Sequence, residues 1–157
     1  ISVLNAGWGG ATAAAWNEGT QSFAAQQMIK TLNPDLVILN LGINDGTPTD
    51  PLLSKAQFKA QVQTLINAAR NGGADVMLVA PNDGSPVDFG ARYGVLGVGL
   101  QELAVEQSLK FLNLRTVLGT WAVANAAGHM RDAVHPNAAG YSQIATAVAD
   151  VIMPGGA

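Results

Sequence analysis

Residues 34–45 read PDLVILNLGIND, and within them residues 36–41 form an almost unbroken apolar run. A second run, residues 75–80, reads DVMLVA, and a shorter one, residues 111–114, reads FLNL. Strands with little polar alternation are typical of parallel sheets, because helices cover both faces of such a sheet. We therefore expect these runs to be buried parallel strands, and Ser2–Asn5 to be the end of a further strand.

Helical patterns lie between the predicted strands. One face of residues 54–72 is apolar at helical spacing, through Phe58, Val62, Leu65, Ile66 and Ala69. Ser54 and Gln57 form a capping-box pattern at the start of this helix, and Gly72 suits its end. Further helices are expected near residues 21–30 and across Leu100, Leu103, Ala104 and Leu109. The inner stripe of a C-terminal helix is expected at Ile144, Ala145, Val148 and Ile152.

Alternation of strands and helices indicates a three-layer α/β/α domain with a parallel sheet and right-handed crossovers. A length of 157 residues fits one domain with one core. Residues 115–132 show no clear period, and we expect them to form a long loop.

The composition narrows the function classes. Hydrophobic residues make up 48% of the chain, charged residues make up 12%, and the net charge is −3. These values favour a folded protein and offer no basic surface for nucleic acid. The absence of cysteine excludes disulfides, a cysteine nucleophile and a thiolate metal site. No apolar run reaches the roughly 18 residues of a membrane span. The abundance of Ala, Gly and Asn weakly favours a secreted bacterial or phage protein.

Three polar or glycine-rich blocks follow the predicted strands. The block NAGWGGAT, residues 5–12, follows the first strand, and GINDG, residues 42–46, follows the second. The block DAVHPN, residues 132–137, follows the last strand and its loop. Because sites in open α/β sheets form at the carboxyl ends of the strands, we expect these blocks to meet at one edge.

In this order, the blocks resemble those of the SGNH, or GDSL-type, hydrolase family. Residues 42–45 are similar to the family's Gly-x-Asn-Asp block, and residues 132–135 are similar to its Asp-x-x-His block. The glycine cluster is similar to the block whose glycine N–H faces the oxyanion. The resemblance covers nearly the whole chain, and it implies a flavodoxin-like fold with strand order 2-1-3-4-5 and the hydrolysis of carboxylic esters.

The resemblance also implies site residues. His135 would be the general base that takes the nucleophile's proton and returns it to the leaving alcohol, and Asp132 would orient the imidazole. The backbone N–H of Gly10 and the side-chain amide of Asn44 would donate to the oxyanion. The implied substrate is a small acyl ester, such as an acetylated carbohydrate, a lipid ester or a thioester, and neither a cofactor nor a metal is expected.

The serine nucleophile is missing from this pattern. In the family it lies in a Gly-Asp-Ser block upstream of the glycine cluster, which here begins at Gly7. Ser85 lies in NDGSP, where the order is scrambled and the preceding strand is the wrong one. We expect the nucleophile, and the first central strand before it, on a segment that is absent from this chain. Residues 1–157 would then be a single domain, the C-terminal portion of a longer or cleaved polypeptide, with a slot in its sheet.

Other functions stay open. The chain could be a non-catalytic relative, a binding or structural domain that has lost its nucleophile. Residues 7–12 form a partial dinucleotide-binding pattern that lacks the third glycine. His129, Asp132 and His135 are evenly spaced and could bind a metal, although His129 by itself is expected to be a solvated loop residue.

Structural roles compete with the functional ones. Asn44 could cap a turn, the glycine cluster could be only a tight turn, and His135 could belong to a loop that starts a helix. Asp45 is expected to bond nearby backbone as a turn residue. We expect Trp8 and Trp121 to pack against neighbouring residues rather than contact substrate, although both lie near the edge of the expected site.

Overall fold

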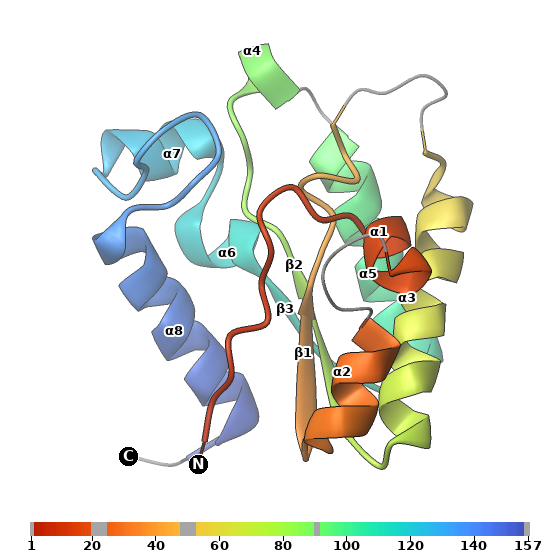
Figure 1. Cartoon of the computed structure of the whole chain (residues 1–157). Helices are drawn as coiled ribbons and strands as arrows, with labels where there is room; N and C mark the ends of the chain where they lie inside the picture. Colours follow the sequence, from red (N-terminus) through yellow and green to blue (C-terminus); the bar gives the residue numbers. More distant parts are fainter. Residues whose placement is uncertain (1, 20–24, 48–52, 90–91, 156–157) are drawn as a thin grey trace.

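The computed structural model describes residues 2–19, 25–47, 53–89 and 92–155. Its strands are β1 (Leu36–Asn40), β2 (Asp75–Ala80) and β3 (Lys110–Asn113). Its helices are α1 (Ala13–Glu18), α2 (Ala25–Leu32), α3 (Lys55–Asn71), α4 (Pro86–Phe89), α5 (Arg92–Glu106), α6 (Leu114–Leu118), α7 (Trp121–Ala126) and α8 (Ala138–Ile152). Among the described residues the sheet has the order β1-β2-β3, and both pairings are parallel (Figure 1).

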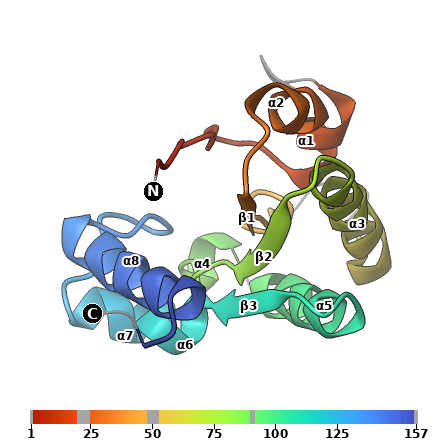
Figure 2. The ribbon, with the colours of Figure 1, turned by 90° about the horizontal axis from the view of Figure 1, so that it is seen from below.

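Helices cover both faces of this sheet, as the alternation of patterns predicts. The view from below places α3 and α5 on one face and α6 and α8 on the other (Figure 2). The arrangement is the expected three-layer α/β/α fold, and the three apolar runs are its parallel strands. The predicted helix near residues 21–30 is α2, although residues 20–24 lie outside the described part.

The central strand β2 explains why its sequence has no polar alternation. Val76, Leu78 and Ala80 pack into the core made by α3 and α5. Met77 and Val79 point to the opposite face and pack with residues of α6 and α8. All five side chains are 5% exposed or less. Burial of an aliphatic side chain stabilises the fold by about 1.5–3 kcal/mol, so both faces of β2 contribute to the core.

Helix α3 begins and ends where its local signals predict. The Ser54 hydroxyl accepts the N–H of Gln57 at 3.2 Å, and the Gln57 side chain accepts the N–H of Ser54 at 2.9 Å. Gly72 follows the last residue as the C-cap. The predicted apolar face is buried in full, through Phe58, Val62, Leu65, Ile66 and Ala69.

The prediction of a long loop over residues 115–132 is wrong. Two short helices, α6 and α7, occupy most of this range. Asn113 caps α6 by accepting the N–H of Arg115 at 3.0 Å, and Thr120 caps α7 through the N–H of Val123 at 3.4 Å. Helices of five and six residues are too short to show a helical period in the sequence.

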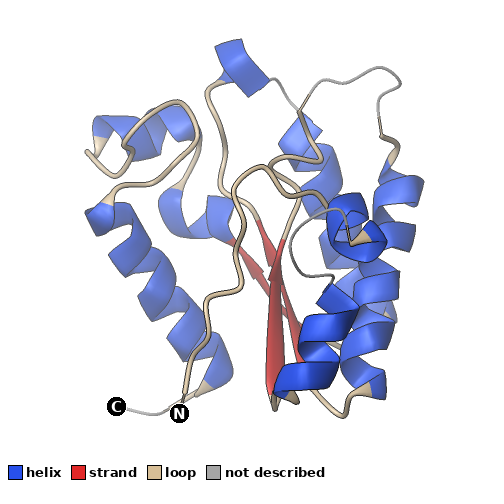
Figure 3. Cartoon of the chain, viewed as in Figure 1, coloured by secondary structure: helices blue, strands red, loops and turns tan. Residues whose placement is uncertain are grey.

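The prediction of a strand at Ser2–Asn5 is also wrong for this structure. Residues 2–8 have no regular structure and run past the sheet without joining it (Figure 3). Val3 is 89% exposed and Leu4 is 63% exposed. A strand needs a neighbour for its backbone N–H and C=O groups, and the described residues offer this segment none, because β1 pairs only with β2.

Helix α8 differs in part from its predicted inner stripe. Ile144 and Ile152 pack against the Met77 and Val79 side of the sheet, and Val151 joins them. Ala145 is exposed instead of buried, while Val148 is half-buried. The difference arises because α8 packs mainly on α6 and β3, at one side of the sheet.

The cap of α3 gives a direct stability test. Ser54→Ala should lower the free energy of unfolding by about 1 kcal/mol, because the N–H of Gln57 loses its acceptor. Thr64→Ala, on the exposed face of the same helix, is the matched control and should be neutral or slightly stabilising, since alanine favours helix. Urea unfolding of both variants measures the difference, and equal effects would contradict the capping role.

Candidate active site

Three segments lie at the carboxyl edge of the sheet, and two of them, residues 42–46 and the loop with His135, belong to blocks that the sequence singles out. Residues 42–46 follow β1 and make a tight turn. Residues 81–85 follow β2, and Pro81 lies beside Gly42, whose added Cβ would be 3.4 Å from the proline ring. Asn82 then reaches the loop before α8, where its amide donates to the carbonyl of Val134 at 2.9 Å. The turn after β1, the end of β2 and the loop with His135 thus form one continuous edge.

Asp132 and His135 form a bonded pair in that loop. The Nδ1 atom of His135 lies 2.9 Å from Oδ1 and 3.0 Å from Oδ2 of Asp132. Because this bond occupies Nδ1, the other ring nitrogen, Nε2, is left to accept a proton. Both side chains are accessible, with 54% exposed for His135 and 42% for Asp132.

The Asp132 carboxylate is held by the backbone as well as by the imidazole. Its Oδ1 accepts the N–H of His135 at 2.8 Å and the N–H of Val134 at 3.0 Å. These two N–H groups, with smaller contributions from the His135 ring and Arg131, hold the pKa of Asp132 well below its usual range. The carboxylate therefore stays ionised at neutral pH and can stabilise an imidazolium.

The loop that carries this pair is closed at its base. The N–H of Arg131 donates to the carbonyl of His135 at 2.8 Å, and the N–H of Asn137 donates to the carbonyl of His129 at 2.9 Å. The Asn137 side chain also donates to Gly128 at 2.7 Å and caps α8. These bonds fix residues 128–137 as a compact unit on the N-terminus of α8.

Ser85 anchors the loop from the other side, and sequence reasoning did not find this role. Its backbone N–H donates to the carbonyl of Ala133 at 2.7 Å, and the residue is only 5% exposed. This burial agrees with the expectation that Ser85 is not the nucleophile. The only sequence signal for the anchor was the position of residues 82–86 directly after a buried strand.

Asn44 and Gly10 lie on two adjacent segments. The amide of Asn44 donates to the carbonyl of Ala11 at 2.9 Å, next to Gly10. An amide carries two hydrogens, so this bond does not exhaust its donor capacity. Gly10 has φ +79° and is exposed, with no atom within 4 Å of an added Cβ. Glycine adopts this left-handed backbone without the strain that a side chain would bring.

Asp45 joins these two segments through its carboxylate. Oδ1 accepts the N–H of Ala13 at 2.8 Å, and Oδ2 accepts the N–H of Gly42 at 3.1 Å. The residue is 5% exposed, and burial raises the pKa of its carboxyl, against the smaller lowering effect of its backbone donors. Asp45 is therefore a structural residue, as expected, but it bonds the start of α1 as well as its own turn.

The metal-site alternative receives little support from the geometry. Within the described ranges no group of three His, Cys, Asp or Glu side chains is arranged to hold a metal. His129 lies with its Nε2 atom 3.2 Å from the amide nitrogen of Gln143, and not in the Asp132–His135 bond.

In the part of the chain that is described, no helix has the length and apolarity to span a bilayer.

Asp45 gives a stability prediction. Asp45→Ala should lower the free energy of unfolding by about 2–4 kcal/mol, because two buried N–H groups lose their acceptor. Asp45→Asn keeps one acceptor oxygen and should cost less. Chemical denaturation at neutral pH measures both, and equal stability of the alanine variant and the wild type would contradict this role.

The same residue gives a pH dependence. Because the folded state raises its pKa, the folded protein binds this proton more tightly than the unfolded chain does, between the ordinary and the raised pKa. The contribution of Asp45 to stability therefore falls as the pH rises through the raised pKa. The stability advantage of the wild type over Asp45→Asn should accordingly grow as the pH is lowered from 7 into that range, and a constant difference would contradict the shift.

Comparison with known proteins places these observations in a family. Comparison with curated proteins yields no significant match. The structure is similar to an acetylxylan esterase from Geobacillus stearothermophilus, at 21% identity and a TM-score of 0.66 over 92% of this chain and 68% of that one. It is also similar to a lipase/acylhydrolase from Enterococcus faecalis (18% identity, TM-score 0.71, 91% of this chain and 71% of that one). A GDSL-like lipase from Bacteroides thetaiotaomicron matches at 19% identity and a TM-score of 0.69, over 91% of this chain and 71% of that one.

These structural similarities establish the fold, and a match at the level of sequence establishes the family. The model of the GDSL-like lipase/acylhydrolase family matches residues 1–143. The matched region contains the glycine cluster, the turn after β1 and the loop with the Asp132–His135 pair. The chain belongs to the GDSL-like lipase/acylhydrolase family, whose members hydrolyse esters.

Proposed function

We propose that this protein hydrolyses carboxylic esters through a Ser-His-Asp acyl-enzyme mechanism, in which Asp132 and His135 supply the acid–base pair. The observation that carries the proposal is that both carboxylate oxygens of Asp132 lie within hydrogen-bond distance of Nδ1 of His135, at 2.9 and 3.0 Å. This contact orients the ring and leaves Nε2 to act as the base. Gly10 and Asn44, at the same edge of the sheet, supply the oxyanion donors.

In the proposed reaction, residues of this chain transfer the protons and stabilise the oxyanion. As a serine hydroxyl attacks the ester carbonyl carbon, its proton passes to Nε2 of His135. The carbonyl oxygen becomes an oxyanion that accepts hydrogen bonds from the Gly10 N–H and the Asn44 amide, each worth about 3–4 kcal/mol. His135 returns the proton to the leaving alcohol, and water repeats the sequence to release the acid and restore the serine.

The serine in this proposal comes from a segment outside residues 1–157, on a strand beside β1. Two observations support an open strand position there. Ile38, on the α8 side of β1, is 42% exposed, although Met77 beside it in the sheet is fully buried. Val3 and Leu4 are apolar and exposed. A strand inserted between β1 and residues 2–5 would pair both and would place a Gly-Asp-Ser turn at the carboxyl edge.

The substrate class that we propose is a small acyl ester, with an acetylated carbohydrate as the leading case. The similarity to an acetylxylan esterase supports this case. A lipid ester is the other class that the family description covers. A relative that lacks the nucleophile and only binds its ligand is the competing proposal.

Removal of the imidazole tests the proposed base. In the full-length natural protein, His135→Ala should lower kcat for p-nitrophenyl acetate by about 1,000-fold or more. Thermal stability should hold, since the loop is fixed by backbone bonds that this change leaves in place. His129→Ala, a histidine on the same loop, is the matched control and should keep its activity. Activity that survives in His135→Ala would refute the role.

Labelling tests the proposed nucleophile. A fluorophosphonate should modify the full-length natural protein at one serine, and peptide mass spectrometry should place the label in a Gly-Asp-Ser segment that precedes residue 1. Labelling should be lost in His135→Ala, because the serine is then no longer activated. A label on Ser85 would overturn the proposed position. A protein that neither reacts nor hydrolyses p-nitrophenyl acetate would be the non-catalytic relative.

A further inference from the structure

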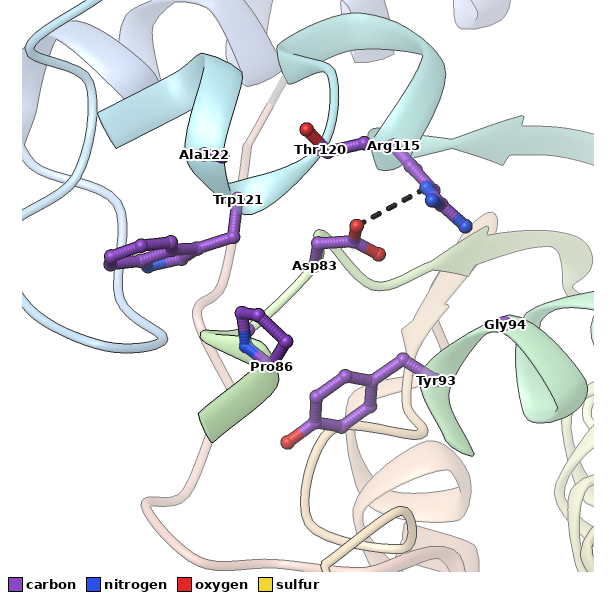
Figure 4. Close-up of a pocket in the computed structure, with 9 residues that line it drawn as sticks. Asp83, Pro86, Tyr93, Gly94, Arg115, Thr120, Trp121 and Ala122 are labelled. Carbon is purple, nitrogen blue, oxygen red and sulfur yellow. Dashed lines mark ion pairs between the residues drawn. The ribbon is translucent and has the colours of Figure 1, made fainter. Parts of the chain in front are cut away.

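A cavity of about 410 Å³ lies between Trp121 and Tyr93, with Asp83 and Arg115 in its wall (Figure 4). Its walls come from three separated parts of the chain: the turn after β2, the start of α5, and helices α6 and α7. The lining residues that carry the argument are Asp83, Pro86, Tyr93, Gly94, Arg115 and Trp121.

The cavity is attached to the candidate active site on two sides. The indole N–H of Trp121 donates to the carbonyl of Asp132, at 3.4 Å. On the other side, Tyr93 packs against Gly46, where an added Cβ would lie 2.8 Å from the tyrosine ring. Gly46 closes the turn that carries Asn44. Two residues that line the cavity, Trp121 and Tyr93, therefore contact the Asp132 loop and the turn with Asn44.

The polar part of the lining is an ion pair. Nε of Arg115 lies 3.2 Å from Oδ2 of Asp83. The Arg115 side chain is 50% exposed and that of Asp83 is 20% exposed, so both remain accessible from the cavity. The guanidinium offers several N–H donors and the carboxylate offers acceptors. Since the two charges compensate each other, the site does not favour an anion.

The apolar part of the lining indicates which class of neutral ligand fits beside the ion pair. Trp121 and Pro86 offer flat apolar surfaces at one end of the cavity (Figure 4). The Tyr93 phenol is neutral at physiological pH, and burial raises its pKa further, to about 12. An acyl chain in this cavity would desolvate the ion pair without replacing its hydrogen bonds. A sugar ring fits better, because its C–H face packs on an aromatic ring while its hydroxyls both donate and accept.

We infer that this cavity binds the pyranose ring of a carbohydrate ester, on the alcohol side of the scissile bond. The inference rests on the proposed function for the identity of the reaction. We assign the alcohol side because the leaving alcohol takes its proton from His135, and Trp121 in the cavity wall donates to the carbonyl of Asp132 in the same loop. Adjacent hydroxyls of the ring would bond Asp83 and Arg115, with the ring against Trp121.

Gly94 allows the cavity to be filled without removing any polar group. An added Cβ at this position would lie 3.9 Å from Nη1 of Arg115, an ordinary contact. Alanine should therefore fit, whereas leucine should project into the space that the sugar needs. Gly94→Ala is thus the matched control for Gly94→Leu.

Kinetics in the full-length natural protein test the inference with two acetyl esters. Gly94→Leu should lower kcat/KM for glucose pentaacetate by about tenfold or more, mainly through KM. The value for p-nitrophenyl acetate, which has no sugar, should stay near that of the wild type, as should both values in Gly94→Ala. An equal loss on both esters would overturn the inference, and so would a selective loss on p-nitrophenyl octanoate, which would assign the cavity to an acyl chain.

Binding without hydrolysis separates this inference from the proposed function. Titration with methyl β-D-glucopyranoside should shift the indole N–H signal of Trp121 in NMR spectra, with Trp121→Phe used for assignment and Gly94→Leu abolishing the shifts. The shift should occur even if the protein proves unable to hydrolyse p-nitrophenyl acetate, in which case only the proposed function fails. Hydrolysis of p-nitrophenyl acetate without any shift of the Trp121 signal would overturn the sugar site alone.

Discussion

Burial of β2 on both faces is the constraint on which the rest of the molecule depends. Its side chains alternate between the core under α3 and α5 and the core under α8, so the strand cannot slip by one residue without exchanging the two sets. Its parallel pairing then aligns β1 and β3, with Ile38 beside Met77 and Asn113 beside Ala80. Because all three strands end at one edge, the segments that follow them share a small region of space.

Polar contacts to backbone groups, rather than further apolar packing, hold that region in shape. Asn82 and Ser85 fix the loop of the Asp132–His135 pair to the end of β2. Asp45 fixes the start of α1 to the turn after β1. Such contacts permit His135 and Asp132 to be exposed and still well oriented. A reactive pair needs both conditions, since it must meet a substrate in a defined geometry.

The two ends of the site differ in completeness. On the side of β3, the Asp132–His135 pair, the loop that supports it and the neighbouring cavity all consist of described residues. Toward the outer edge of β1, Ile38 and the segment with Val3 and Leu4 are exposed, and β1 has a paired neighbour on one side only among the described strands. The solved relatives share this fold, and the chain spans 68–71% of their length in the comparisons above.

Local signals in the sequence were sufficient for several elements. The capping box of Ser54 and Gln57 fixed the start of α3, and the apolar runs marked all three strands, because these patterns depend on neighbours along the chain. The short helices α6 and α7 escaped detection because their caps, Asn113 and Thr120, are followed by too few residues to show a period. The strand expected at Ser2–Asn5 failed for the opposite reason, since its pattern is strand-like but its pairing partner is not a local property.

The sequence by itself determined the α/β class and the order of the three blocks. It also determined that Asp132 can reach His135, because two residues three positions apart in one loop are close enough for their side chains to bond. Only the tertiary structure decided that Ser85 is an anchor, that Asp45 joins two segments and that Trp121 stands beside Asp132 with a cavity at its side. These features join residues that are distant in the chain. Their contacts depend on the layers of the fold, which no periodicity or motif in the sequence records.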